Sequence, residues 1–357
     1  MLAPNEVVRS LQERVRSAAA NREQLIIRAG GTKDFYGNRT DATPGQLDPR
    51  QYCGLLDYEP TELCLTACSG TPLSEIEHAL EKHNQMLAFE PPCFGSTATL
   101  GGAIASGLSG PRRVSAGSVR DFVLGATLLD GRGNVLTFGG KVMKNVAGYD
   151  VSRALAGSLG TLGVILDVSL KVVPRPAVEQ TLQFELAESE AIQRTNVWAG
   201  QPLPVSATAW IDGVLSVRLS GSNAGVRAAC AKLGGDLLNS AAEFWNQLRE
   251  QTHAFFKHTD PVPVWRLSVP PSTAPLNLGA TLIEWRGGQR WICSTAHAAE
   301  IRACAKNAGG HATAFRNATF SNVFHPLSPV LQQIHRRLKD EFDPMRLFNP
   351  GRMFPDA

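Results

Sequence analysis

The chain has 357 residues, which exceeds a typical single domain and favours two. A formal net charge of only +3, with arginines scattered along the chain, argues against nucleic-acid binding. No apolar run approaches the ~20 residues that a membrane span needs. The N-terminus carries charges where a signal peptide needs its apolar core, so a cytoplasmic location is expected.

The seven cysteines contain no C-x-x-C pair, and their number is odd. This pattern favours reduced thiols packed as small apolar groups over disulfides or metal ligands. We therefore expect no metal site and no iron–sulfur cluster in this chain. Electrons handled by the protein must leave through another group.

The first half of the chain alternates short apolar strands with glycine-rich segments. Apolar residues at helical spacing predict helices around residues 7–15 and 73–80. Residues 122–130 and 135–138, separated by Gly131-Arg-Gly-Asn134, predict a β-hairpin. Other strands are predicted at residues 25–27, 63–67 and 164–173, the last ending at Pro174 because proline cannot continue a ladder.

The composition changes near residue 177, where the glycine clusters thin out. Strands predicted at 181–186, 215–219, 264–269, 281–285 and 291–294 alternate with helices predicted at 225–233, 241–256 and 298–307. A helix at 327–342 follows. The pattern is α+β. We expect one domain at residues 1–176, a second α+β domain at 177–320, and a segment at 321–357 that returns to the first.

Two segments place consecutive glycines next to short strands, Arg28–Thr32 and Thr99–Ala103. Glycine allows close approach of the backbone, and converging N–H groups form a nest that binds anions. Threonine hydroxyls at 32, 97 and 99 could add donors. A pyrophosphate fits such a pair of loops, and a third glycine-rich segment follows at 157–163.

Other nucleotide sites lack their fingerprints, because the chain has neither a G-x-x-x-x-G-K-[ST] motif nor a G-x-G-x-x-G after an N-terminal strand. A serine hydrolase is an alternative, since Ala156–Gly160 reads A-x-S-x-G. That motif requires a strand before the serine and a helix after it. The helix-like residues 150–155 and the Gly-Thr-Leu-Gly turn that follows argue against it.

Six ordered motifs resemble those of the FAD-linked oxidases of the vanillyl-alcohol oxidase/PCMH type, in the branch of 2-hydroxy-acid dehydrogenases. They are Arg28–Thr32, Phe89–Pro92, Thr99–Gly102, Lys144–Asp150, Gly157–Ile165 and Phe348–Arg352. Residues 107–113 and 119–125 further resemble the smaller, FAD-binding (E) subunits of bacterial glycolate oxidases. The resemblance implies a PCMH-type FAD-binding domain of two subdomains, followed by an α+β cap.

The resemblance also implies roles for single residues. Gly30, Gly31 and Thr32 would hold the FAD pyrophosphate, with Arg28 at the mouth of the loop. The second segment would run along the ribityl chain and phosphates, using Pro92, Gly95, Ser96, Thr97, Leu100, Gly101, Gly102 and Ser106. Gly160, Gly163, Val164 and Ile165 would meet the flavin or adenine through backbone groups, and Asn349 would lie near the isoalloxazine. In this superfamily, covalent attachment of the flavin usually uses a histidine of the first loop. Residues 28–37 contain no histidine, so FAD is expected to be bound non-covalently.

Oxidation of a 2-hydroxy acid needs a cation for the carboxylate and a base for the hydroxyl proton. Arg316 and Arg352 are candidates for the cation and His325 for the base, because arginine binds carboxylates in a bidentate fork. The chain departs from the large catalytic relatives, which carry an H-x-G-D-G-N-x-H-type motif. Its second-domain histidines are isolated in the sequence.

Three functions stay open. The chain is an FAD-binding subunit of a glycolate oxidase, oxidising glycolate and D-lactate beside a larger FAD-binding catalytic subunit and an iron–sulfur subunit. Alternatively, it is a self-sufficient FAD-dependent 2-hydroxy-acid dehydrogenase. In the third interpretation it is a non-catalytic scaffold. The subunit interpretation is preferred and allows a peripheral position at the inner membrane through the complex.

Overall fold

The computed structural model describes residues 4–39, 45–140, 150–257 and 262–354. Two large antiparallel sheets dominate these residues. A five-stranded sheet has the order β3-β4-β8-β6-β7, and an eight-stranded sheet has the order β13-β10-β12-β11-β15-β16-β14-β17. Two-stranded pairs β1-β2 and β5-β9 complete the strands that the structure describes. Separate antiparallel sheets with helices packed on them confirm the predicted α+β class.

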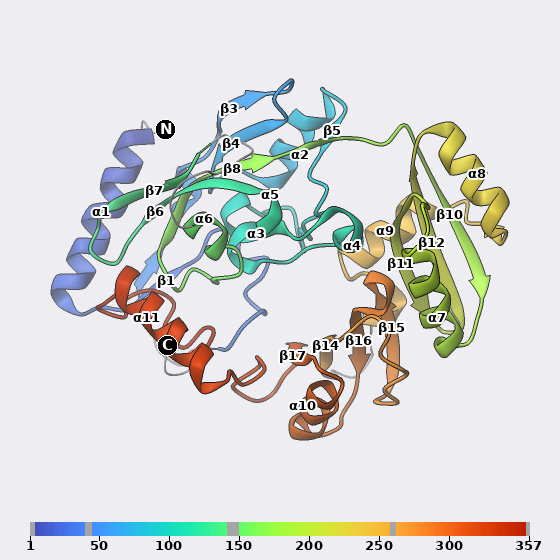
Figure 1. Cartoon of the computed structure of the whole chain (residues 1–357). Helices are drawn as coiled ribbons and strands as arrows, with labels where there is room; N and C mark the ends of the chain where they lie inside the picture. Colours follow the sequence, from blue (N-terminus) through green and yellow to red (C-terminus); the bar gives the residue numbers. More distant parts are fainter. Residues whose placement is uncertain (1–3, 40–44, 141–149, 258–261, 355–357) are drawn as a thin grey trace.

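In the first half of the chain, helices surround the five-stranded sheet (Figure 1). In chain order the elements of this half are α1 (Pro4–Asn21), β1 (Leu25–Ile27), β2 (Gly45–Leu47), β3 (Leu55–Glu59), β4 (Cys64–Cys68), α2 (Leu73–Glu81), β5 (Gln85–Met86), α3 (Leu100–Ser106), α4 (Arg113–Ala116), α5 (Val119–Phe122), β6 (Val123–Leu129), β7 (Val135–Gly139), α6 (Val151–Ala154), β8 (Val164–Lys171) and β9 (Val173–Pro174). The predicted hairpin is confirmed as β6 and β7.

The second half forms the eight-stranded sheet and its helices. Its elements are β10 (Val178–Glu185), α7 (Glu188–Ala199), β11 (Val205–Ile211), β12 (Val214–Gly221), α8 (Asn223–Leu233), β13 (Asp236–Leu237), α9 (Ala241–Arg249), β14 (Val264–Ser268), β15 (Ala280–Glu284), β16 (Gln289–Cys293), α10 (Ala298–Asn307) and β17 (His311–Arg316). Short 3₁₀ turns occur at 254–256 and 285–287, and another lies in the first half at 49–51. We call the eight-stranded sheet with these helices the cap. The exact domain limits stay predictions.

One predicted helix is too long. Residues 241–256 were expected to be helical throughout, but α9 ends at Arg249 and a separate 3₁₀ turn follows at 254–256. The break is at Gln251, whose φ of 52° lies in the left-handed region that an α-helix does not allow. Glu250, just past the helix end, reaches the first half of the chain and accepts hydrogen bonds from the N–H groups of Cys93 and Phe94.

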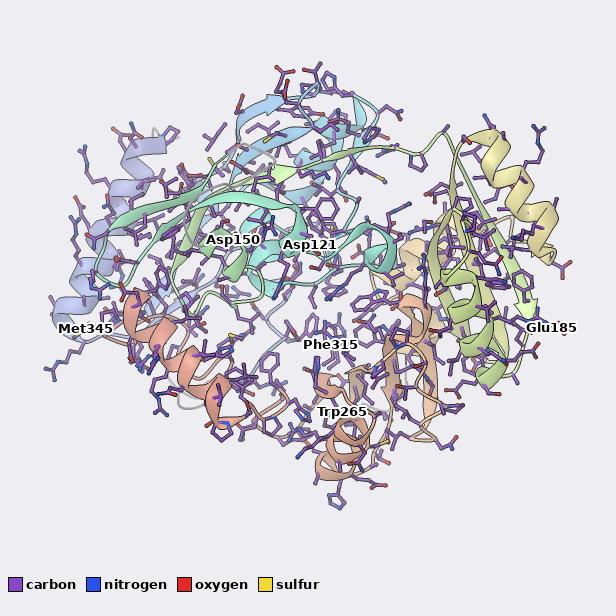
Figure 2. All side chains as sticks on the ribbon, in the orientation of Figure 1. Asp121, Asp150, Glu185, Trp265, Phe315 and Met345 are labelled. Atoms are coloured by element: carbon purple, nitrogen blue, oxygen red, sulfur yellow. The ribbon has the colours of Figure 1, made fainter. Side chains whose placement is uncertain are left out.

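Aromatic packing joins the cap to the first half. Phe315 of β17 lies 5.5 Å from Phe35 and 5.0 Å from Tyr36, measured between ring centroids. Figure 2 labels Phe315 near the middle of the molecule and Trp265 further into the cap. Tyr36 and Leu108 belong to one buried cluster with Trp245, Trp291 and other cap residues. The interface is therefore an apolar core shared by both halves.

The last segment returns to the first half, as predicted. After α11 (Pro329–Phe342), Phe348 forms a parallel bridge with Leu25 of β1. A buried lysine fixes this return: Lys339 Nζ donates to Asp343 Oδ2 at 2.8 Å, to the carbonyl of Phe348 at 2.9 Å and to that of Thr161 at 2.6 Å. With all three donors satisfied, the buried charge is tolerated and links the C-terminal segment to the 157–163 segment. No helix in the described part of the chain is both long and apolar enough to cross a bilayer.

Candidate functional site

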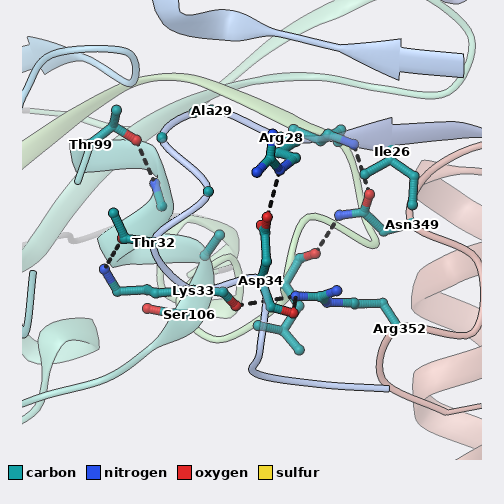
Figure 3. Close-up of a pocket in the computed structure, with 16 residues that line it drawn as sticks. Ile26, Arg28, Ala29, Thr32, Lys33, Asp34, Thr99, Ser106, Asn349 and Arg352 are labelled. Atoms are coloured by element: carbon teal, nitrogen blue, oxygen red, sulfur yellow. Dashed lines mark hydrogen bonds and ion pairs between the residues drawn. The ribbon is translucent and has the colours of Figure 1, made fainter. Parts of the chain in front are cut away.

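The three glycine-rich segments converge on one cleft, which we call the glycine cleft. It consists of two adjoining hollows that share Ile27, Ala29, Thr99, Gly102, Ala105, Leu159 and Asn349. Of the residues predicted to bind FAD, its walls contain Arg28, Gly30, Gly31, Thr32, Gly101, Gly102, Ser106, Gly160, Gly163, Val164, Ile165 and Asn349. Figure 3 shows how β1, α3 and the C-terminal segment surround it.

The loop after β1 offers unused backbone donors. Within the described part of the chain, the N–H groups of Gly30, Gly31 and Thr32 donate to no other protein group. Gly31 has φ of 70°, so the loop turns in a way that favours glycine. Arg28 Nε donates to Asp34 Oδ2 at 2.6 Å and closes the loop at its exposed mouth. The result is a nest of free N–H groups suited to an anion.

Gly30 is required because the loop touches the second segment. A Cβ at Gly30 would lie 1.6 Å from the carbonyl oxygen of Thr97. The Thr97 hydroxyl also donates to the carbonyl of Gly30 at 2.7 Å. Thr97 thus supports the nest from behind and does not itself line the cleft.

The second segment is a helix start, which corrects the expectation of a second nest. Thr99 caps α3, its hydroxyl accepting from the N–H of Gly102 at 3.3 Å. The N–H groups of Leu100 and Gly101 donate to the carbonyls of Thr71 and Ser69. Protein groups already use these donors, whereas the cleft has unused backbone N–H groups in the 28–34 loop. The helix instead offers a glycine surface on which a flat ligand can lie.

Ser69 is a site residue that the sequence analysis did not identify. Its side chain is only 1% exposed, yet its hydroxyl has no hydrogen-bond partner among the described residues. It lines the glycine cleft, and a Cβ on Gly101 would lie 2.7 Å from its Cβ. Burying a hydroxyl without a partner is costly, so this orphan donor indicates that a polar ligand completes the site. A serine ending a strand carries no special sequence signal.

Asn349 fixes the third side of the cleft. Its Oδ1 accepts from the N–H of Ile27 at 2.8 Å, and its Nδ2 donates to the carbonyl of Leu159 at 2.6 Å (Figure 3). A Cβ at Gly160 would lie 2.7 Å from that Nδ2. Both ends of the amide are therefore used to hold β1 against the 157–163 segment. The geometry of Asn349 is that of a positioning group, and its place near the isoalloxazine stays a prediction.

The cleft carries positive charge. The described residues of its lining include Arg28, Lys33 and Arg352 but only one carboxylate, Asp34. Burial lowers the pKa of Lys33 to about 8, partly offset by nearby Cys93 and Glu250. Lys33 Nζ lies 3.4 Å from Thr32 Oγ1. An anion in the cleft would stabilise the charged form of Lys33, which burial disfavours. Lys33 is therefore, after Ser69, a second residue to add to those predicted from the sequence.

The three catalytic candidates do not meet in one place. Arg352 lines the glycine cleft, but its guanidinium donates to the carbonyls of Lys33 and Asp34. Arg316 donates to Gln251 Oε1 and stacks 3.6 Å above the centroid of Phe35. Burial lowers its pKa to about 10. His325 lies in a different cavity. Their catalytic roles stay predictions.

Five further predicted residues lie outside the lining of the cleft, namely Pro92, Gly95, Ser96, Thr97 and Leu100. Leu100 is fully buried in the core, and Gly95, Ser96 and Thr97 are exposed. Of the 144–150 motif, only Asp150 falls within the described residues, where it pairs with Arg153. Among the described residues, no group of His, Cys, Asp or Glu side chains is placed to hold a metal ion.

The hydrolase alternative fails on geometry. Ser158 is buried, 6% exposed, and follows α6 and the left-handed Gly157. A nucleophile elbow needs a strand before the serine and an accessible hydroxyl.

The arrangement fits FAD. A nest of free N–H groups, an excess of positive charge, an orphan buried hydroxyl and glycine walls that a Cβ would fill are what a dinucleotide diphosphate requires. With the antiparallel α+β fold, these features define an FAD-binding flavoprotein. The family described as "FAD binding domain" matches residues 6–139 and agrees with that class.

Comparison with known proteins gives the family. The chain is 45% identical to the glycolate oxidase subunit GlcE of Escherichia coli over 357 residues, which covers 100% of both chains. It belongs to the family of FAD-binding glycolate oxidase subunits that includes GlcE. FAD is its cofactor, and its relatives make it an oxidoreductase.

More distant relatives match less than half of the chain. The glycolate oxidase subunit GlcD of Bacillus subtilis is 31% identical over 43% of this chain and 33% of its own length. A D-lactate dehydrogenase of Archaeoglobus fulgidus is 38% identical over 42% of this chain and 33% of its own. A solved alkyldihydroxyacetonephosphate synthase shares the fold, with a TM-score of 0.66 at 15% identity over 95% of this chain and 74% of that one.

Proposed function

We propose that this chain is the FAD-binding subunit of a glycolate oxidase (glycolate dehydrogenase) complex that oxidises glycolate and D-lactate to the 2-oxo acids. The observation that carries the proposal is the glycine cleft with its orphan Ser69 hydroxyl, in a chain related over its whole length to GlcE. The names of the more distant relatives, glycolate oxidase subunit and D-lactate dehydrogenase, support the two substrates.

The residues of the cleft divide the work of holding the cofactor. Bound FAD supplies the two-electron acceptor that the oxidation needs. The N–H groups of Gly30, Gly31 and Thr32 and the ammonium of Lys33 bind the diphosphate, because they are the unused donors and the buried cation of the cleft. Asn349 keeps the two walls in register.

Attachment of FAD is proposed to be non-covalent. Burial, with Glu250 and Glu77 nearby, raises the pKa of the Cys93 thiol to about 11, which keeps it protonated and a poor nucleophile at neutral pH. Cys93 is also absent from the lining of the cleft. Acid precipitation should release the flavin into the supernatant, and a pellet that stays yellow would contradict the proposal.

The chain is proposed to act beside a larger FAD-binding catalytic subunit and an iron–sulfur subunit that accepts its electrons, in the cytoplasm and at the inner membrane through the complex. The name of the relative, a subunit of glycolate oxidase, supports an assembly. The alternatives are a self-sufficient 2-hydroxy-acid dehydrogenase and a scaffold. We favour the subunit because the relative that matches the whole length of this chain is itself named as a subunit.

Two measurements test this proposal. The absorbance spectrum of the purified chain should show flavin, and a colourless protein that cannot be loaded with FAD would support the scaffold. Dye reduction by glycolate or D-lactate should be slow with the loaded chain alone and fast after the partner subunits are added. Rates of hundreds per second from the chain alone, in the upper ordinary range for enzymes, would support the self-sufficient enzyme.

A further inference from the structure

A second cavity lies between the first half of the chain and the cap. We call it the arginine cavity, and its volume is about 490 Å³. Its walls include Arg113 of α4, Arg266 of β14 and His311 of β17. Ser106 lines both this cavity and the glycine cleft, so the two adjoin at the end of α3.

The cavity is lined by cations without matching acids. Among the described residues, its lining contains the arginines 113, 120 and 266 and the histidines 311 and 325, but no Asp or Glu. In the described part of the chain, none of these arginines forms an ion pair with a carboxylate. Burial lowers the pKa of Arg113, and the charges of Arg266 and Arg120 lower it further. Such crowding of like charges is relieved by a bound anion.

The carboxylate of Asp121 does not provide that relief. Asp121 raises the pKa of Arg113 slightly against the other influences, so it lies within electrostatic range. Its Oδ2, however, accepts hydrogen bonds from both the N–H and the hydroxyl of Ser118, in the capping box of α5. Asp121 is therefore committed to starting a helix and is not among the residues that line the cavity.

Aromatic rings hold the arginines without consuming their hydrogen-bond donors. The Arg113 guanidinium lies 4.5 Å from the centroid of Trp285, and that of Arg266 lies 5.6 Å from the centroid of Phe315. Arg266 makes one long hydrogen bond, 3.4 Å, to the hydroxyl of Tyr36. Stacked guanidiniums keep their N–H edges available, and a pair of such edges suits a planar carboxylate.

We propose that the arginine cavity binds a small carboxylate anion, held by Arg113 and Arg266 beside the end of the glycine cleft. The proposal deepens the proposed function and rests on it in one respect, namely that the anion is the 2-hydroxy acid or its 2-oxo product. It moves the carboxylate clamp from Arg316 and Arg352 to two arginines that between them make only one long side-chain hydrogen bond in the described structure. Phe324 and Leu327, which also line the cavity, provide an apolar wall for the rest of a small acid.

The test uses the FAD-loaded chain, alone and with its partner subunits, and oxalate as a small unreactive carboxylate. Isothermal titration should show oxalate binding that weakens at least tenfold in Arg113→Gln and in Arg266→Gln. The FAD content of these variants should equal that of the wild type. Arg194→Gln is the matched control, because Arg194 lies exposed on α7, pairs with Glu190 and is absent from the cavity.

Arg113→Gln carries the test if Arg266→Gln does not fold, because Arg113 makes no hydrogen bond through its side chain in the described structure. Wild-type oxalate affinity in Arg113→Gln, absence of oxalate binding to the wild type, or tighter binding of inorganic phosphate than of oxalate would each overturn the carboxylate site. If arginine-dependent oxalate binding is found but the assembled complex does not oxidise glycolate or D-lactate, the proposed function fails and the anion site stands.

Discussion

Replacing Gly30 with alanine should abolish FAD retention while leaving the rest of the protein folded. The new Cβ would lie 1.6 Å from the carbonyl oxygen of Thr97, whereas ordinary contact begins near 3.4 Å. The 28–34 loop and the Thr97 turn must therefore separate by about 1.8 Å. Because binding groups tolerate a displacement of only about 0.5 Å, the N–H groups of the nest lose their aim.

The size of the effect follows from the bonds that are lost. The hydrogen bond from the Thr97 hydroxyl to the Gly30 carbonyl contributes about 1 kcal/mol to the local structure. Each N–H group that donates to a charged phosphate contributes about 1.5–3 kcal/mol, so loss of two costs about 3 kcal/mol or more. That corresponds to an increase of over about a hundredfold in the Kd for FAD.

The assay is titration of the apoprotein with FAD, followed by flavin fluorescence, with thermal unfolding of both proteins as a check of folding. Gly140→Ala is the control, because a Cβ there meets nothing within 4 Å. It should bind FAD as the wild type does. A Kd for Gly30→Ala within about threefold of the wild type would refute the reasoning, since it would mean that the loop does not position the cofactor.

Two further predictions concern pH. The pKa of Lys33 is near 8, so the lysine loses its charge above that pH in the apoprotein and FAD affinity should fall between pH 7 and pH 9.5. Lys33→Arg should remove this pH dependence. A pH-independent Kd for FAD in the wild type would exclude Lys33 from the site. Burial raises the pKa of Glu284 to about 7 from an ordinary 4.5, and its Oε2 accepts hydrogen bonds from Trp291 and Gln289. The unfolded chain ionises first, so this carboxyl reduces the free energy of unfolding as pH rises from about 4.5 through 7. Glu284→Gln should therefore be more stable than the wild type by about 3 kcal/mol at pH 8 and equal to it near pH 4.5, as measured by urea denaturation.

The sequence identified residues that line the glycine cleft where backbone conformation decided their place, and their binding roles stay predictions. Gly30 and Gly31 lie in the cleft because close approach and positive φ exclude other residues, and such positions leave a mark in the sequence. Asn349 was found through the terminal motif. The family and the FAD cofactor followed from the order of the motifs, and both are confirmed by the comparisons.

Prediction from the sequence failed where a residue's role depends on the groups that it contacts in the folded chain. Thr99-Leu-Gly-Gly looked like a second nest, but Thr99 caps a helix and turns those N–H groups toward protein acceptors. Ser69 and Lys33 belong to the cleft through burial alone, which local sequence does not encode. Strand β11 was missed because its alternating Ser, Ala and Thr residues are small and only weakly apolar, although most of the strand is buried.

The same limit applies to the catalytic candidates, whose roles stay predictions. Arg316 and Arg352 were chosen because arginine binds carboxylates in a bidentate fork. Only the fold shows that Gln251 accepts from the Nε of Arg316 and that two backbone carbonyls accept from one terminal nitrogen of Arg352. Arg113 and Arg266 lie 153 positions apart in the sequence, on elements whose meeting depends on how the cap packs.

The return of the C-terminal segment has a consequence for biosynthesis. Asn349 closes the glycine cleft, and the buried Lys339 and Asp343 hold it there, so the cofactor site is built from both ends of the chain. Although domains generally fold from the N-terminus as the chain leaves the ribosome, this one lacks a wall until Asn349 has emerged. Flavin loading is therefore a late event, and a chain truncated before α11 should leave the ribosome with its first sheet formed but without cofactor.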